Sequence, residues 1–274
     1  MIRKILATLA ALALAGPIQA ATLAEIQRYW NATQLDRYVE ILSDGGVDYG
    51  VSLDDYYLLG KGGADWKVRV EVIYDPDRLS DEMKSEVRAE LEPLDLTDAL
   101  AFFESELGQR IVSAEYAALD ALSHADVWEA TQRMMVAPDA ILPRREALFG
   151  RLMDAGGYLD TALASQLNGQ IAFIQGLTSH GAFAGIMAER EMMDWLAGEE
   201  PTMRAALYDW TRALFYLSYK GFDDHELEQL VTVIEQSDVI GVTSAVYRGI
   251  DRVQHRCLGE LGAEVARSYD EDAL

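Results

Sequence analysis

Two stretches of the chain align with each other without a gap: ESELGQRIVSAEYAALD at residues 104–120 and EQSDVIGVTSAVYRGID at residues 235–251. The identical positions are Glu104/Glu235, Ser113/Ser244, Ala114/Ala245, Tyr116/Tyr247 and Asp120/Asp251. A repeated unit of this kind shows how a fold is built and leaves the reaction or the ligand open.

Apolar residues recur at steps of three and four along both copies, which predicts amphipathic α-helices. The first copy places them at Leu96, Leu100, Phe103, Leu107, Ile111, Ala114, Ala118 and Leu122, and the second at Leu227, Val231, Ile234, Val242, Ala245, Gly249 and Val253. Gly108 in the first copy, and Asp238 with Gly241 in the second, predict a bend or break in the middle of each long helix.

A weaker similarity precedes each copy. The segment RYWNATQ at Arg28, followed by Leu-Asp, resembles RLMDAGG at Arg151, followed by Leu-Asp one residue later. The repeat unit is then half of the chain, and a loop bracketed by Pro138 and Pro143 separates the halves. The sequence therefore predicts an all-α fold of two pseudo-symmetric helical-bundle halves, residues 21–138 and 143–270, from an internal duplication.

Residues 66–74 are the one segment that argues against an all-α chain. Trp66, Val68, Val70, Val72 and Tyr74 alternate with polar residues, as in a half-exposed strand. We predict helix here, because no second run alternates in this way and a lone strand would leave its backbone groups unpaired.

Helix boundaries are readable near the second copy. Pro201 predicts the start of a helix that ends before Gly221, following the usual preference for proline at the start and glycine past the end. Asp223 and Glu226 have the spacing of a capping box for the next helix, which we favour over a catalytic pair.

The first twenty residues predict a cleaved secretory signal peptide. Arg3 and Lys4 precede an apolar run that is too short to span a bilayer, and Ala20 is a small residue at the expected cleavage site. We expect a periplasmic protein with no transmembrane segment in the mature chain. The chain has 23 Lys and Arg against 46 Asp and Glu, a net charge of −23, so a nucleic acid is not an expected partner.

The sequence predicts no metal site and no cofactor. The histidines, His124, His180, His225 and His255, lack the spacing of a zinc signature. Asp75-Pro-Asp77 begins like a calcium loop but continues with Leu79, so we predict a turn between helices. Cys257, the single cysteine, is predicted to be a buried apolar residue. Small residues around Gly176 predict close helix packing.

The run FFESELGQRI at residues 102–111, preceded by Trp66 and by Tyr74-Asp75 behind the predicted signal peptide, resembles a secreted all-helical bacterial family catalogued as a domain of unknown function (family 2059). The second copy lacks the aromatic pair and the Gly-Gln, so the likeness there rests on the repeat. The resemblance implies an all-helical fold, helix at residues 66–74 and a periplasmic location in a Gram-negative bacterium. It brings no catalytic residues, because none is established for the family.

Glu104, Glu235, Tyr116 and Tyr247 are the candidate site residues, because both copies keep them on one repeated helix beside the buried stripe. Pseudo-twofold packing would bring them together with Asp120 and Asp251 at a central seam. The competing interpretation is that the tyrosines anchor packing and place a hydroxyl near a carboxylate.

We therefore expect a non-enzymatic module that binds another envelope protein or a small apolar ligand between the halves. The alternative is an envelope-acting hydrolase or lyase that uses carboxylates such as Glu104 and Glu235 at the seam. A third hypothesis is cation binding by the acidic surface.

Overall fold

The described part of the structure, a computed structural model, covers residues 20–136, 141–179 and 189–272, and it is helical with no strand within those ranges. Its α-helices are α2 (Leu23–Ala32), α3 (Leu35–Leu53), α4 (Gly63–Ile73), α5 (Pro76–Leu91), α6 (Thr97–Phe103), α7 (Glu106–Ser123), α8 (Ala125–Met135), α9 (Pro143–Gly156), α10 (Tyr158–Thr178), α11 (Glu189–Tyr219), α12 (Asp224–Ile234) and α13 (Ser237–Asp272). A π-helical turn, η2 (Asp54–Leu58), extends α3. The all-α prediction is confirmed. The predicted signal peptide and His180 lie outside the described residues.

Residues 66–74 are helical, as predicted. Helix α4 buries Trp66, Val70 and Ile73 on one side. Val68 and Val72 are 56% and 61% exposed. The strand-like alternation therefore combines buried residues of the helix with two valines that lie on its solvent-exposed side. A helix with two exposed valines can therefore imitate the pattern of a strand.

The predicted breaks in the two long helices are wrong in position by a few residues. The first lies at Glu104-Ser105, between α6 and α7, and the second between Ile234 and Ser237. Ser105 caps α7 by accepting a hydrogen bond from the backbone N–H of Gly108 at 3.1 Å. A Cβ atom on Gly108 would lie 2.1 Å from the carbonyl oxygen of Phe102, so this glycine permits the sharp corner and does not mark the break itself.

Helix α11 starts earlier than predicted and ends where expected. It continues N-terminal of Pro201, where Leu196 is buried and extends the apolar stripe, and it ends at Tyr219 before Gly221. Residues 189–200 add about three turns before Pro201, and the burial of Leu196 among them outweighs the local preference for starting a helix at proline. The capping box of Asp223 and Glu226 is confirmed at the start of α12.

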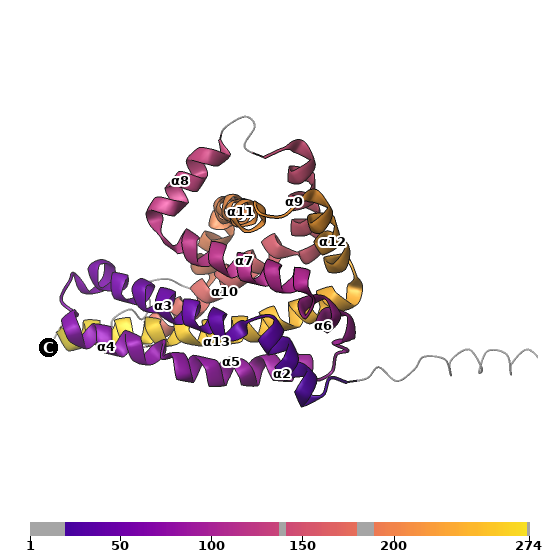
Figure 1. Cartoon of the computed structure of the whole chain (residues 1–274). Coiled ribbons are helices and arrows are strands. Elements are labelled where there is room, and N and C mark those ends of the chain that lie inside the picture. Colours follow the sequence, from indigo (N-terminus) through magenta and orange to yellow (C-terminus); the bar gives the residue numbers. More distant parts are fainter. Residues whose placement is uncertain (1–19, 137–140, 180–188, 273–274) are drawn as a thin grey trace, which may run out of the picture.

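The described residues form two apolar clusters, and each contains a helix from the other half of the sequence. The first core is built mainly from α2 to α5, and α13 lies along it and packs on α5 (Figure 1). The second core is built from α9, α11 and α12, and α7 packs on α11, which is seen nearly end-on in Figure 1. The long helix α7 of the first half of the sequence thus packs on the core of the second half, and α13 of the second half packs on the core of the first. The division into 21–138 and 143–270 stays a prediction.

Helices α10 and α13 approach each other at the level of their backbones. A Cβ atom on Gly176 would lie 2.0 Å from the carbonyl oxygen of Gly259, and one on Gly262 would lie 2.1 Å from that of Phe173. No side chain fits in either place, which is the close packing predicted for the segment around Gly176. Cys257, one turn away on α13, is fully buried in the first core, as predicted.

We predict that Gly262→Ala destabilises the protein by about 2 kcal/mol or more, because overpacking against backbone forces the two helices apart. Gly259→Ala is the matched control on the same helix, since its Cβ would lie 3.6 Å from the carbonyl oxygen of Ala172, an ordinary contact. Urea unfolding followed by circular dichroism measures both variants. Equal stability of the two alanine variants would show that the contact between α10 and α13 is looser than described.

Candidate functional site

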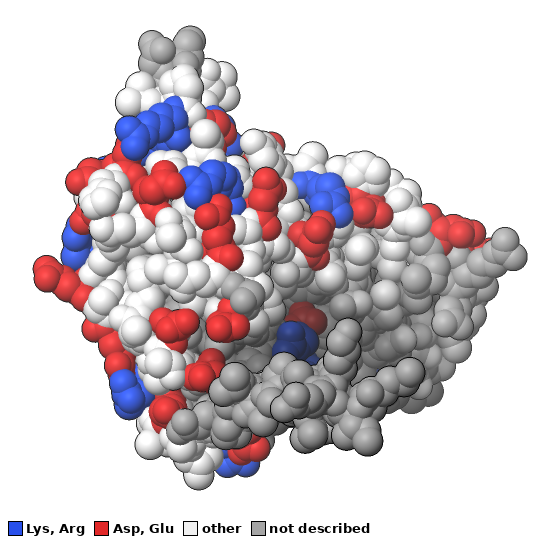
Figure 2. Space-filling view, turned by 90° about the vertical axis from the view of Figure 1, so that its right-hand side faces the viewer, with Lys and Arg blue, Asp and Glu red and all other residues white. Residues whose placement is uncertain are grey.

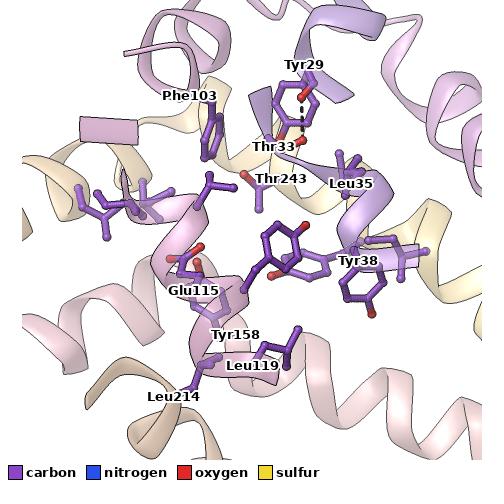
Figure 3. A pocket seen from close by; sticks show the side chains of 18 of the residues that line it. Tyr29, Thr33, Leu35, Tyr38, Phe103, Glu115, Leu119, Tyr158, Leu214 and Thr243 are labelled. Carbon is purple, nitrogen blue, oxygen red and sulfur yellow. Dashed lines mark hydrogen bonds between the residues drawn. The ribbon is translucent and has the colours of Figure 1, made fainter. Parts of the chain in front are cut away.

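A cavity of about 200 Å³ lies where the two halves meet (Figure 3). Helices α2, α3, α6, α7, α10, α11, α12 and α13 contribute to its wall. The lining is dominated by aromatic and aliphatic side chains: Tyr29, Leu35, Tyr38, Phe103, Ile111, Val112, Tyr116, Leu119, Tyr158, Leu214, Phe215, Leu230, Ile234, Val246, Tyr247 and Ile250. The polar members among the described residues are Thr33, Thr243 and Glu115 besides the tyrosine hydroxyls.

The two repeat copies meet across this cavity. Four positions of α7 and their counterparts in α13 both line it, namely Val112/Thr243, Glu115/Val246, Tyr116/Tyr247 and Leu119/Ile250. Their spacing of three, four and seven residues is one face of a helix. Helices α7 and α13 therefore present equivalent faces to the same space.

Glu115 is the carboxylate of the cavity. Its Oε1 accepts a hydrogen bond from the hydroxyl of Tyr219. Burial raises the pKa of Glu115 from 4.5 to about 7, and the Tyr219 hydrogen bond only partly opposes this. Glu115 keeps some accessible surface because it faces the cavity, where Figure 3 shows it opposite Leu35 and Tyr38.

The tyrosines around Glu115 remain neutral at physiological pH. Burial raises the pKa of Tyr38 to about 12, and it raises the pKa values of Tyr29, Tyr116 and Tyr247 further. Glu115 is thus the group in the described wall that changes charge near neutrality.

A larger cleft of about 660 Å³ adjoins the cavity between α10, α11 and α13. Seven residues line both spaces: Tyr38, Leu119, Tyr158, Leu214, Phe215, Tyr247 and Ile250. Polar groups are more frequent in the cleft, where Asp251 accepts a hydrogen bond from Ser165 and lies 3.2 Å from Nε2 of His255. The cleft gives the cavity a polar side that opens toward solvent.

Two of the four predicted site residues come together and two do not. Tyr116 and Tyr247 line the cavity, and Asp251 lines the cleft. Glu104 and Glu235 line neither space. Each follows the last residue of a short helix and binds an arginine at the surface.

The two glutamates make equivalent ion pairs. Nε of Arg28 donates to Oε1 of Glu104 at 2.8 Å, and Nε of Arg151 donates to Oε1 of Glu235 at 3.1 Å. Arg28 and Arg151 are also the residues that begin the weaker similarity upstream of each copy. The bond with Arg28 lowers the pKa of Glu104. These carboxylates tie α2 and α9 to the corners that precede α7 and α13.

Glu115 was not among the residues that the sequence singled out. One signal was present, because Glu115 aligns with Val246 of the second copy, and a carboxylate at a position that is apolar in the other copy of a buried face is unusual. Because the chain contains 46 acidic residues, this one substitution does not stand out in the sequence. The tertiary structure shows that Glu115 faces the cavity.

Within the described residues, no group of three or more His, Cys, Asp or Glu side chains is arranged to hold a metal ion, and no helix has the length and apolarity needed to cross a bilayer. Comparison with protein-family models, curated proteins and solved structures finds no match to the chain. The resemblance to the family of unknown function stays a prediction.

We predict that Glu115→Gln stabilises the protein at pH 8, by on the order of 2 kcal/mol, and has little effect at pH 5. The folded pKa of Glu115 lies above its ordinary value, so the unfolded state binds fewer protons between these values and the wild type loses stability as pH rises from about 4.5 to about 7. Urea unfolding at both pH values measures the difference.

Glu104→Gln is the matched control. The pKa of the Glu104 carboxyl is lowered in the folded state, so removing this charge destabilises the protein at pH 8. The change in stability therefore has the opposite sign from that of Glu115→Gln. A Glu115→Gln variant that is less stable than the wild type at pH 8 would show that Glu115 is not a desolvated carboxylate.

Proposed function

We propose that the protein binds a small molecule of largely apolar surface in the cavity between α7 and α13. The carrying observation is an apolar, aromatic space of about 200 Å³ in the middle of an otherwise packed chain. Native interiors contain few voids larger than a water molecule. An apolar cavity of about 150 Å³ already binds benzene. The space is therefore sufficient for a small aromatic ligand, and the adjoining cleft supplies a route of entry.

A periplasmic location of the protein is part of the same proposal. The predicted signal peptide supports a periplasmic protein, and the excess of acidic residues supports a partner other than nucleic acid or an anionic membrane. A second envelope protein remains the alternative partner that the sequence predicts.

Internal duplication is part of the proposal as well. Its support is the pair of equivalent ion pairs, Arg28 with Glu104 and Arg151 with Glu235, and the left-handed backbone at Gln34 and Gly157, six residues after each arginine. Duplication would explain why the cavity lies between equivalent faces of α7 and α13.

The geometry gives less support to a hydrolase or lyase at the seam. Acid and base catalysis by two carboxylates needs them about 5 to 10 Å apart. Among the described residues, Glu115 alone supplies a carboxylate to the cavity, and Glu104 and Glu235 are bound to arginines outside it. Binding accounts for the cavity without a second carboxylate.

We predict that indole binds to the protein and that Val246→Phe weakens this binding at least 10-fold. Val246 lines the cavity and is 7% exposed, so the added ring occupies the space of the ligand. Isothermal titration calorimetry measures the affinity, and thermal unfolding checks that the variant folds.

Val68→Phe is the matched control, because Val68 lies exposed on α4 and away from the cavity. It leaves indole affinity unchanged. If indole binds equally well to both variants, or does not bind to the wild type, the cavity is not a ligand site for small rings.

A further inference from the structure

The cavity holds a carboxylate without a cation to balance it. Among the described lining residues Glu115 is the one with a formal charge, and no Lys or Arg lines the space. Surface carboxylates of this chain are commonly paired with arginine, as Glu146 is with Arg212 at 2.7 Å, and Figure 2 shows acidic and basic side chains side by side. Glu115 differs from these surface groups because, within the part of the chain that the structure describes, its hydrogen-bond partner is a tyrosine hydroxyl and not an arginine.

A buried carboxylate in such a place is costly when ionised. Its Oε1 accepts a hydrogen bond from Tyr219, and no Lys or Arg among the described lining residues balances its charge. Two states remove the cost of this buried negative charge. Either the carboxyl takes up a proton, or a ligand that carries a positive charge fills the cavity.

The wall around Glu115 suits the second state. The tyrosines that line the cavity come from α2, α3, α7, α10 and α13: Tyr29, Tyr38, Tyr116, Tyr158 and Tyr247. Aromatic rings attract cations through their quadrupole, and groups of such rings bind quaternary ammonium ions. Arg37, which is not part of the lining, already lies 5.7 Å from the centroid of the Tyr116 ring.

We infer that the cavity binds a small organic cation of the quaternary ammonium class, with Glu115 opposite the charge and the tyrosine rings against its methyl groups. This inference rests on the proposed function, since it names the chemistry of the ligand of the same cavity. A methylated ammonium has an apolar surface, so it also suits the aliphatic part of the wall.

The charges outside the cavity agree with entry of a cation. The chain has a net charge of −23, which raises the local concentration of cations at its surface. In the cleft, Arg248 is held by Glu90 at 2.6 Å from Nε to Oε2, and Asp160 is paired with Arg204 at 2.7 Å, while Asp251 accepts a hydrogen bond from Ser165. A cation approaching through the cleft therefore meets the carboxylate of Asp251 and an arginine whose charge is already paired.

The test compares choline with 3,3-dimethylbutan-1-ol, which has the same shape and no charge. We expect calorimetry at pH 8 to show choline binding at least 10-fold more tightly than the alcohol to the mature wild-type chain. In Glu115→Gln the preference falls to within about 3-fold, because the amide keeps the shape and the bond with Tyr219 and removes the charge. Glu104→Gln, at the surface ion pair, keeps the full preference.

A second set of variants tests the rings and does not depend on Glu115. Tyr247→Leu weakens choline binding several-fold, and Tyr247→Phe restores it, because phenylalanine keeps the ring and loses only the hydroxyl. Loss of affinity in both variants, or in neither, would contradict a role for the ring.

The pH dependence gives a third readout. The titratable groups that line the described cavity beside Glu115 or bond to it are tyrosines, namely Tyr29, Tyr38, Tyr116, Tyr158, Tyr219 and Tyr247, and the pKa of each is raised by burial. Choline affinity therefore falls as pH drops below about 7, where Glu115 takes up a proton, whereas binding of the alcohol does not weaken.

Equal affinity for choline and the alcohol would overturn the inference and leave the proposed cavity function intact. Binding of indole without any binding of choline would do the same. Failure of all three compounds to bind would contradict the proposed function itself.

Discussion

The backbone contact between α10 and α13 is the constraint on which the rest of the structure depends. Gly176 and Gly262 allow the two helices to touch without intervening side chains. The C-terminal part of α13 is thereby held beside α10 while its buried face packs on α5. Because α13 is one continuous helix of 36 residues, fixing that part also fixes the direction of the part that faces α7.

This arrangement explains why the middle of the molecule is not filled. Helices α7 and α13 each pack on the core of the other half, and between them the side chains of both copies meet as tyrosines, valines and leucines of unequal size. Side chains of unequal size on the two helices leave a space between them that the lining residues do not fill.

The sequence could predict much of the fold from local rules. The capping box at Asp223 and the turn at Asp75 follow from residue type and spacing, which act within one or two turns. The helix over residues 66–73 is predicted against its own alternation, because no second run offers a partner strand. The predicted positions of the breaks in the long helices differ from the observed ones, because the residue at which a helix changes direction depends on the helices it packs against. The start of α11 was missed for the same reason, since the burial of Leu196 overrides the preference at Pro201.

The sequence by itself determined the all-α class and singled out Tyr116 and Tyr247, which both line the cavity, because periodicity and internal similarity are properties of a single chain. Only the tertiary structure decided that Glu104 and Glu235 bind arginines at the surface and that Glu115 lies inside the cavity. The chain carries 46 acidic residues, and a carboxylate becomes chemically distinctive through desolvation and the lack of a cationic partner. Both conditions are set by helices distant in sequence, so no local pattern reveals them.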